Sequence, residues 1–365
     1  MGFSCGIVGL PNVGKSTLFN ALTATQSAQA ANFPFCTIEP NVGKVAVPDP
    51  RLERLAEMAK SQKIIPTQLE FVDIAGLVRG ASKGEGLGNQ FLGNIRETDC
   101  IVHVLRCFES GDITHVEGSV DPIRDAETIE TELMLADLDS MEKRRPALDK
   151  LIRAGNADAK ALVPIIDAII KLLSDGKPAR DYVAKDDEVK LVRSLQLMTS
   201  KPILYVANVD EGDAASGNAH SERVFAKARA EGTEAVLIAA AIESEVAQLG
   251  PDDQKEFLSG LGLDEPGLNK LIRAGYKKLG LLTFFTVGPK EARAWTVFQG
   301  AKAPQAAGAI HTDFERGFIR AETIAYDDFV SLGGEAAARD AGKLRSEGKD
   351  YTTHDGDIFN FRFNV

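Results

Sequence analysis

The segment that most constrains this chain lies at its start, where a short apolar run ends in a glycine-rich loop. Residues 5–9 read Cys-Gly-Ile-Val-Gly, and residues 9–16 match the pattern G-x-x-x-x-G-K-[ST] at every fixed position. Residues 16–23 have helical character, so the loop joins a strand to a helix, the setting in which this pattern binds phosphate groups. The sequence therefore predicts a site for a nucleoside triphosphate at the start of that helix.

The residue types in this loop suit phosphate and Mg²⁺. Gly9 and Gly14 allow backbone N–H groups to close around phosphate oxygens. Lys15 is placed to reach the β- and γ-phosphates, and the Ser16 hydroxyl is placed to bind Mg²⁺. The predicted nucleotide-binding residues of the loop are Asn12, Val13, Gly14, Lys15, Ser16 and Thr17.

Two further segments are predicted to complete the metal site. Asp73 follows the apolar residues 71–72, and an aspartate at the end of a strand holds Mg²⁺ directly or through water. Gly76 lies three residues later, where its amide would reach the γ-phosphate. Thr37, in the loop 32–41, is expected to be the remaining ligand; the alternative is a structural loop rich in turn residues.

A fourth segment, Asn208-Val209-Asp210-Glu211, occupies the place where guanine-specific P-loop proteins carry N-K-x-D. Val209 replaces the lysine, and Glu211 is one methylene longer than the aspartate that pairs with guanine. Asn208 could pair with the N6 and N7 atoms of adenine. We therefore expect ATP to bind and GTP to bind more weakly, with Ala240 and Ala241 flanking the base.

The residue after Gly76 is Leu77, where many GTPases have a glutamine that orients the attacking water. Hydrolysis is therefore expected to be slow or to depend on another group. His115 is one candidate because imidazole titrates near neutral pH; the alternative is a structural or solvated histidine.

Residues 80–93 carry five glycines and are interpreted as a nucleotide-dependent switch or, alternatively, a surface loop. Cys36 is either a redox-sensitive group beside the metal site or a packed thiol.

The pattern of apolar runs predicts the fold class. Short apolar runs alternate with helical segments, which indicates an α/β domain with a mostly parallel sheet. Residues 125–198 show helical periodicity and are interpreted as an inserted helical domain; the alternative is additional helices packed on the sheet. Residues 281–365 predict a small α+β domain with one helix at 305–314. The predicted strands are 5–9, 68–72, 100–105, 203–207, 235–241, 283–287, 294–298, 318–324 and 358–363.

Composition narrows the setting. The net charge of −11 does not indicate a strongly basic nucleic-acid binder, although the basic runs 143–145 and 270–278 leave local RNA contacts open. The four cysteines lack C-x-x-C spacing, so the sequence indicates neither a zinc site nor a disulfide framework. No apolar stretch reaches about 18 residues, and no secretory leader is evident. We therefore expect a cytoplasmic protein without membrane association.

Taken together, these motifs resemble those of the Obg-like ATPases of the YchF subfamily, within the translation-factor-related P-loop GTPases. The resemblance covers nearly the whole chain and includes the glycine-rich stretch 73–91. Residues 304–314 look like part of that family's TGS domain, a ubiquitin-like β-grasp module. The resemblance implies a G domain at 1–124 and 199–280, a coiled-coil-like helical domain at 125–198 and a TGS domain at 281–365.

The resemblance also implies an activity and partners. It implies acceptance of ATP, a hydrophobic residue in place of the catalytic glutamine, and association with the ribosome or its large subunit. RNA contacts through the TGS and helical domains, a monomeric state and K⁺ bound near Asn12 are further expectations. The rival interpretations are an Obg-type GTPase and a nucleotide-sensing ribosome- or RNA-binding protein with vestigial hydrolysis.

Overall fold

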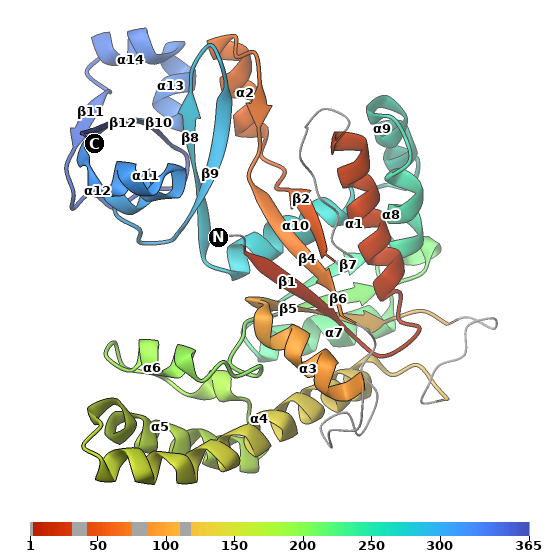
Figure 1. The fold of residues 1–365 in the computed structure, drawn as a ribbon. Helices are drawn as coiled ribbons and strands as arrows, with labels where there is room; N and C mark the ends of the chain where they lie inside the picture. The colour runs from red at the N-terminus through yellow and green to blue at the C-terminus, as the bar shows by residue number, and fades with distance from the viewer. Residues whose placement is uncertain (1–2, 31–41, 75–86, 110–117, 365) are drawn as a thin grey trace. The chain divides into compact units, whose positions relative to one another are not determined.

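The computed structural model describes residues 3–30, 42–74, 87–109 and 118–364 (Figure 1). Five residues singled out above lie outside this part of the chain: Cys36, Thr37, Gly76, Leu77 and His115. The contacts divide the chain into two compact units, Met1–Lys44 with Glu70–Leu271, and Val45–Leu69 with Ile272–Val365.

The first unit is built on a six-stranded sheet in the order β2-β4-β1-β5-β6-β7. Neighbouring strands from β4 to β7 pair in parallel, as predicted. All residues of β5 and β6 are buried, which is typical of central parallel strands covered on both faces. The strands are β1 (Ser4–Val8), β2 (Val42–Ala46), β4 (Gln68–Asp73), β5 (Cys100–Arg106), β6 (Ile203–Asn208) and β7 (Glu234–Ile238).

Strand β7 ends earlier than the sequence suggested. The predicted strand 235–241 is apolar throughout, but β7 ends at Ile238 and a helix begins at Ala240. Alanine has the highest helix propensity, so the run of alanines continues as helix. The helices of the first unit outside the helical segment are α1 (Lys15–Ala30), α3 (Leu87–Glu97), α7 (Ala219–Ala230), α8 (Ala240–Val246) and α9 (Pro251–Gly260). The boundary between the two units falls within α10 (Gly267–Lys278). The last part of the predicted switch segment, residues 87–93, belongs to helix α3, and residues 80–86 are outside the described residues.

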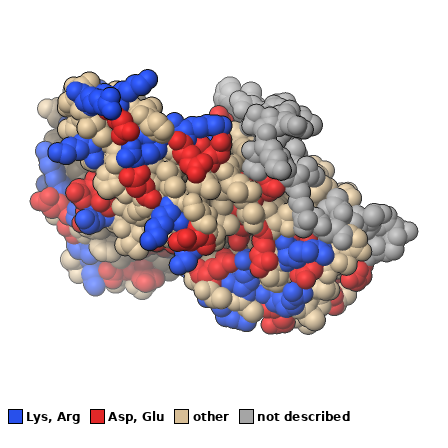
Figure 2. All heavy atoms as spheres, turned by 90° about the horizontal axis from the view of Figure 1, so that it is seen from below, with Lys and Arg blue, Asp and Glu red and all other residues tan. Residues whose placement is uncertain are grey.

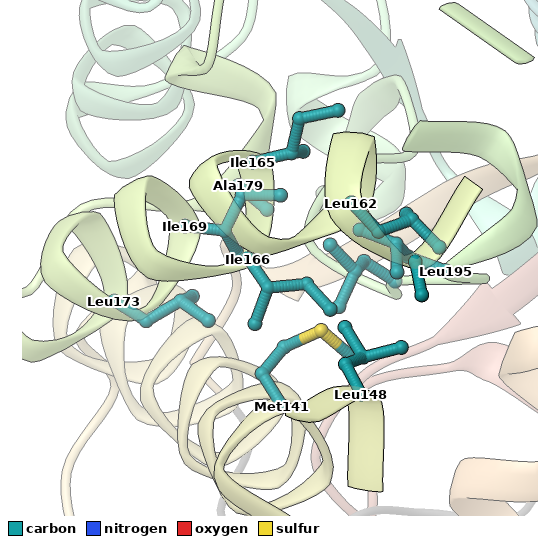
Figure 3. Packing of buried hydrophobic residues seen from close by; sticks show 11 residues of the cluster. Met141, Leu148, Leu162, Ile165, Ile166, Ile169, Leu173, Ala179 and Leu195 are labelled. Carbon is teal, nitrogen blue, oxygen red and sulfur yellow. The ribbon is translucent and has the colours of Figure 1, made fainter. Parts of the chain in front are cut away.

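The helical segment forms a hairpin with its own core. Asp121 caps α4 (Pro122–Arg153) and Asn156 caps α5 (Ala157–Ser174), and the two helices pack against each other. A 3₁₀ turn (Ala179–Asp181) and the short α6 (Val189–Ser194) complete the segment. Figure 3 shows Met141 and Leu148 on the side of α5 toward which Ile166 points, within one buried cluster. A separate core is what an inserted domain needs to hold its shape.

A buried carboxylate ties helix α4 to the segment that leads into β6. Asp137 on α4 is fully buried and accepts hydrogen bonds from Met198 N (3.1 Å), Thr199 N (2.8 Å) and Thr199 Oγ1 (2.7 Å). Three donors satisfy a charge that would otherwise be costly to bury. The contacts accordingly place the helical segment with the first unit.

The second unit contains a mixed six-stranded sheet in the order β11-β10-β12-β8-β9-β3. The four strands predicted after residue 281 are confirmed. The strands are β3 (Ile64–Ile65), β8 (Leu281–Val287), β9 (Ala292–Phe298), β10 (Phe318–Ala325), β11 (Arg345–Glu347) and β12 (Asp357–Phe363). The helices are α2 (Pro50–Ala59), α11 (Ala303–Ile310), α12 (Thr312–Arg316), α13 (Tyr326–Leu332) and α14 (Glu335–Asp340).

Two features of this unit differ from the sequence prediction. The single helix expected at 305–314 is broken at His311, whose backbone is extended and whose ring accepts a hydrogen bond from Asp313 N to cap α12. The unit also begins earlier than 281, because it includes residues 45–69 and 272–280. Leu55 of α2 packs against Phe285 of β8 in one buried cluster, so a distant segment supplies part of this core.

The two faces of the second sheet carry separate cores. Phe284, Phe359 and Phe361 lie in the cluster that includes the alanines of α11. Ile324 and Ile358 lie in the other cluster, with residues of α2, α13 and α14. Alternate residues of β12 therefore point to opposite faces. Within the described residues, no helix combines the length and apolarity that crossing a membrane requires.

Candidate nucleotide-binding site

The phosphate loop lies between β1 and α1, and two of its residues have left-handed backbone conformations. Asn12 has a φ of 62° and Gly14 a φ of 94°. Glycine adopts such angles readily and asparagine tolerates them better than most residues. A Cβ atom on Gly14 would lie 2.2 Å from Asn208 Nδ2, and one on Gly9 would lie 2.6 Å from the Val104 carbonyl oxygen. Both fixed glycines of the motif are therefore also required by close packing.

Lys15 is buried although it carries an amine. Its Nζ donates a hydrogen bond to the Leu10 carbonyl oxygen at 2.7 Å, so the side chain is folded over the loop. Burial lowers the pKa of Lys15 to about 8, while the negative charge of Asp73 acts in the opposite direction. A bound polyphosphate would favour the charged form and restore a higher pKa. Leu10 was not singled out in the sequence because its contribution is a backbone oxygen.

Ser16 and Asp73 are brought together as predicted for a metal site. The Ser16 hydroxyl donates to Asp73 Oδ2 at 3.5 Å. The other carboxylate oxygen, Oδ1, is buried without a hydrogen-bond partner. Burial raises the pKa of Asp73, against the lowering effect of Lys15 and Ser16. A hydroxyl and an unpaired carboxylate oxygen are the hard ligands that Mg²⁺ prefers, so these residues fit that ion.

Asn208 has contacts that differ from the expectation that it reads adenine. Its Nδ2 donates to the Val13 carbonyl oxygen at 2.9 Å, and its Oδ1 accepts from Ala240 N at 3.0 Å. The side chain is 3% exposed. Both ends of the amide are therefore bonded to backbone groups, and Asn208 joins the phosphate loop to the start of α8.

The other predicted residues of the base region lie around this link. Val209 is buried, and its N–H donates to the Ile238 carbonyl oxygen at 2.8 Å. Glu211 is exposed at the start of a 3₁₀ turn, Glu211–Asp213. Ala240 is buried and Ala241 is exposed in the first turn of α8. Thr17 is exposed next to Ser16 in the first turn of α1.

Glu243 supports this region and was missed in the sequence. It is 2% exposed on α8, and its carboxylate accepts hydrogen bonds from Gly267 N (2.6 Å) and Leu268 N (3.2 Å) at the start of α10. Burial raises the pKa of Glu243, although both backbone donors oppose this effect. Sequence offers no signal for this residue, because its partners lie 24 and 25 positions away. Thr37, Gly76 and His115 lie outside the described residues, and their roles stay predictions.

Comparisons with known proteins agree with this geometry. Residues 4–137 match the family model MMR_HSR1, described as "50S ribosome-binding GTPase". Residues 281–364 match the model YchF-GTPase_C, described as "Protein of unknown function (DUF933)". Both boundaries coincide with elements described above, since residue 4 opens β1 and residue 281 opens β8.

Similar proteins match from end to end. The "Ribosome-binding ATPase YchF" of Pasteurella multocida is 57% identical over 365 residues, 100% of both chains. The proteins of the same name from Escherichia coli O157:H7 and Bacillus subtilis are 55% and 53% identical, again over 100% of both chains. The solved structure of the Schizosaccharomyces pombe YchF GTPase has a TM-score of 0.89 and 38% identity, covering 99% of this chain and 98% of that one.

Proposed function

This chain belongs to the YchF family, and on that premise we propose that it is a ribosome-binding ATPase that converts ATP to ADP and phosphate with Mg²⁺. The observation that carries the proposal is the arrangement of Ser16 and Asp73 beside Lys15. One carboxylate oxygen of Asp73 contacts the Ser16 hydroxyl, and the other is buried without a partner. The names of the bacterial relatives support the ribosome-binding and ATPase assignments.

Each residue has a defined task in this reaction. Mg²⁺ would neutralise charge on the β- and γ-phosphates. Ser16 and Asp73 would hold it, the latter directly or through water. Lys15 would exchange its bond to the Leu10 carbonyl oxygen for phosphate oxygens, and its burial strengthens that charge interaction. The helix α1 directs its N-terminal N–H groups at the same phosphates.

The base preference is proposed from the residues that replace the guanine motif. Val209 is buried and offers no polar group, and Glu211 is exposed and too long to repeat the paired contact of an aspartate. Asn208 is proposed to position the loops that contact the nucleotide, since both ends of its amide are already bonded. We therefore propose ATP over GTP because guanine-specific contacts are lost.

Hydrolysis is proposed to be slow without a partner. Leu77 cannot orient water, and His115 is the candidate replacement. Thr37 and the Gly76 amide are proposed to complete the metal and γ-phosphate contacts. K⁺ near Asn12 is a further proposal, supported by that residue's left-handed backbone in the phosphate loop.

The partner is proposed to be the ribosome or its large subunit, contacted by a monomer in the cytoplasm. Figure 2 shows positive and negative side chains interspersed on the face that it draws, so no single-sign field dominates there. In the basic run 143–145, Lys143 pairs with Asp139 and Arg145 with Asp149 and Asp167. RNA contacts through this helical segment would have to exchange such pairs, which predicts strong dependence on salt.

The test is turnover of the full chain with ATP and with GTP, in K⁺ and in Na⁺, with and without ribosomes. We expect ATP to compete against GTP in binding, and ribosomes to raise the turnover of ATP. A strong preference for GTP would establish the Obg-type GTPase instead. Nucleotide binding with no turnover in any condition would establish the nucleotide-sensing alternative.

A further inference from the structure

The second unit contains a cavity of about 680 Å³ that the nucleotide site does not use. This volume is within the range of pockets that hold ligands. Its lining comes from both faces of the sheet: Phe361 belongs to the core on the α11 face, and Ile324 belongs to the core on the α13 and α14 face. The cavity therefore runs between strands instead of lying on one face of the sheet.

The strands concerned are β8 and β12. They pair in parallel at Phe285 and Ile358. Beyond this pair, Thr286 and Val287 of β8 and Asn360 of β12 line the same cavity. Two strand edges that border an open space offer backbone N–H and C=O groups to an added strand, which is how many proteins take up extended peptides.

One side of the cavity is aromatic. Trp295, Phe314 and Phe363 line it, on the face that also carries Phe361. Phe314 and Phe363 stack with their ring centroids 3.7 Å apart, and Phe363 is 37% exposed. Trp295 donates from Nε1 to Thr286 Oγ1 at 2.9 Å, which fixes its ring at the edge of the cavity. This side suits apolar side chains of an occupant.

The other side combines carboxylates with apolar residues of the α13 and α14 face, namely Ile324, Phe329, Leu344 and Ile358. The charged residues that line the cavity are Lys290, Glu291, Glu322 and Glu335, so three acids face one amine. Glu322 alternates with Ala321 of the aromatic face and lies opposite Asn360 in the β10–β12 pairing. Arg320 and Arg362 pair with Glu322, and Arg339 pairs with Glu335, but none of these arginines lines the cavity. This side suits cationic side chains and disfavours phosphate.

We propose that this cavity binds an extended, basic segment of a partner polypeptide, with apolar and cationic residues alternating along it. Successive side chains of a strand point to opposite faces, so alternation would direct the apolar residues to the aromatic side and the cations to the carboxylates. An RNA strand would bring phosphates against Glu291, Glu322 and Glu335, and charge therefore favours the peptide. The proposal is independent of the nucleotide chemistry in the first unit.

The chain contains its own reporter for this test. Trp295 is the one tryptophan in the sequence, and it lines the cavity. The probe is an acetylated peptide of about nine residues that alternates valine and lysine, which has no fluorescence of its own. We expect it to shift the emission of Trp295 saturably in the full-length protein. Matched probes are the same composition in two blocks, an alternating valine–glutamate peptide, and an oligoadenylate of equal length.

Two sets of variants test the lining. Glu291→Gln with Glu335→Gln is expected to weaken binding of the lysine peptide about fivefold, whereas Asp340→Asn, on the same helix α14 but outside the lining, leaves it unchanged. Asn360→Phe fills the space between the strands and is expected to abolish binding; Ser346→Phe on β11 is its control. Thermal unfolding verifies that each variant is folded.

The outcomes separate clearly. The proposal is supported if the alternating lysine peptide binds more tightly than the matched probes and if only the lining variants lose affinity for it. Equal affinity for the alternating, block and acidic peptides overturns it, as does an unchanged Trp295 spectrum. If oligoadenylate shifts Trp295 and binds more tightly after the glutamates are neutralised, the cavity takes nucleic acid and the peptide proposal is wrong.

Discussion

The side-chain amide of Asn208 donates to the Val13 carbonyl oxygen while its own carbonyl accepts from Ala240 N, at 2.9 and 3.0 Å. One residue at the end of β6 thus connects the phosphate loop with the helix that follows the last strand of the sheet. In the structure this residue contacts protein backbone on both sides, so its effect on nucleotide binding passes through the two loops.

Removing this link should weaken all nucleotides together. Asn208→Ala deletes two hydrogen bonds, each contributing about 0.5–1.5 kcal/mol, so we expect ATP and GTP affinity to fall about tenfold or more. The ratio of the two affinities should stay the same, because no base contact is lost. Competition binding with both nucleotides measures this. A change confined to ATP would show that Asn208 reads adenine after all.

Lys15 should take up a proton when nucleotide binds. Burial lowers its pKa to about 8 in the free protein, and phosphate oxygens favour the ammonium form. If binding restores an ordinary pKa, uptake should be about three-quarters of a proton at pH 8.5 and about one-tenth at pH 7. ATP affinity should accordingly fall as pH rises through 8. Calorimetry in buffers of different ionisation enthalpy measures the uptake, and Lys15→Arg, which stays charged, should lose it.

Asp73 should control the affinity for Mg²⁺ more than that for the nucleotide itself. Asp73→Asn removes the negative charge and one oxygen ligand while keeping an acceptor for the Ser16 hydroxyl. We expect the Mg²⁺ concentration for half-maximal turnover to rise at least about tenfold. Binding of ATP in the presence of a chelator should change little. Equal loss with and without Mg²⁺ would contradict a metal-binding role.

Acid should destabilise the first unit through His103. This residue of β5 is 1% exposed, its Nε2 has no hydrogen-bond partner, and burial lowers its pKa to about 3, with Lys227 adding to the effect. At pH values between about 3 and the ordinary pKa near 6.5, His103 is protonated in the unfolded chain and neutral in the folded chain. Stability therefore falls as pH decreases, by up to about 2 kcal/mol between pH 7 and 5 for this group.

Urea unfolding followed by circular dichroism at the two pH values measures this loss. His103→Phe retains an aromatic ring without a titratable nitrogen, so the part of the loss due to His103 should be absent in it. An identical pH dependence in the variant and the parent protein would show that other groups cause the acid sensitivity.

The features that could be predicted from the sequence are those that neighbouring residues determine. The phosphate loop could be located because its spacing, the preceding strand and the following helix are contiguous, and Ser16 and Asp73 lie at ends of elements that the apolar pattern marks. The contacts of Asn208 could not be predicted, since its partners are 195 and 32 residues away. Sequence also could not assign helix α2 to the core of the second unit, because the strands that it packs against lie far along the chain. Apolarity also failed to distinguish strand from helix at Ala240, and His311 interrupts a segment whose composition favours one helix.

The assignment of residues 45–69 to the second unit bears on how the chain is made. Helix α2 precedes β8 to β12 along the chain, yet the sheet that covers it closes only with β12, a central strand. The apolar side of α2 therefore stays unburied until β12 has been synthesised, although domains usually fold as they emerge. For a protein proposed to act on ribosomes, the unit carrying the peptide cavity can form only after β12 has left the ribosome that produces it.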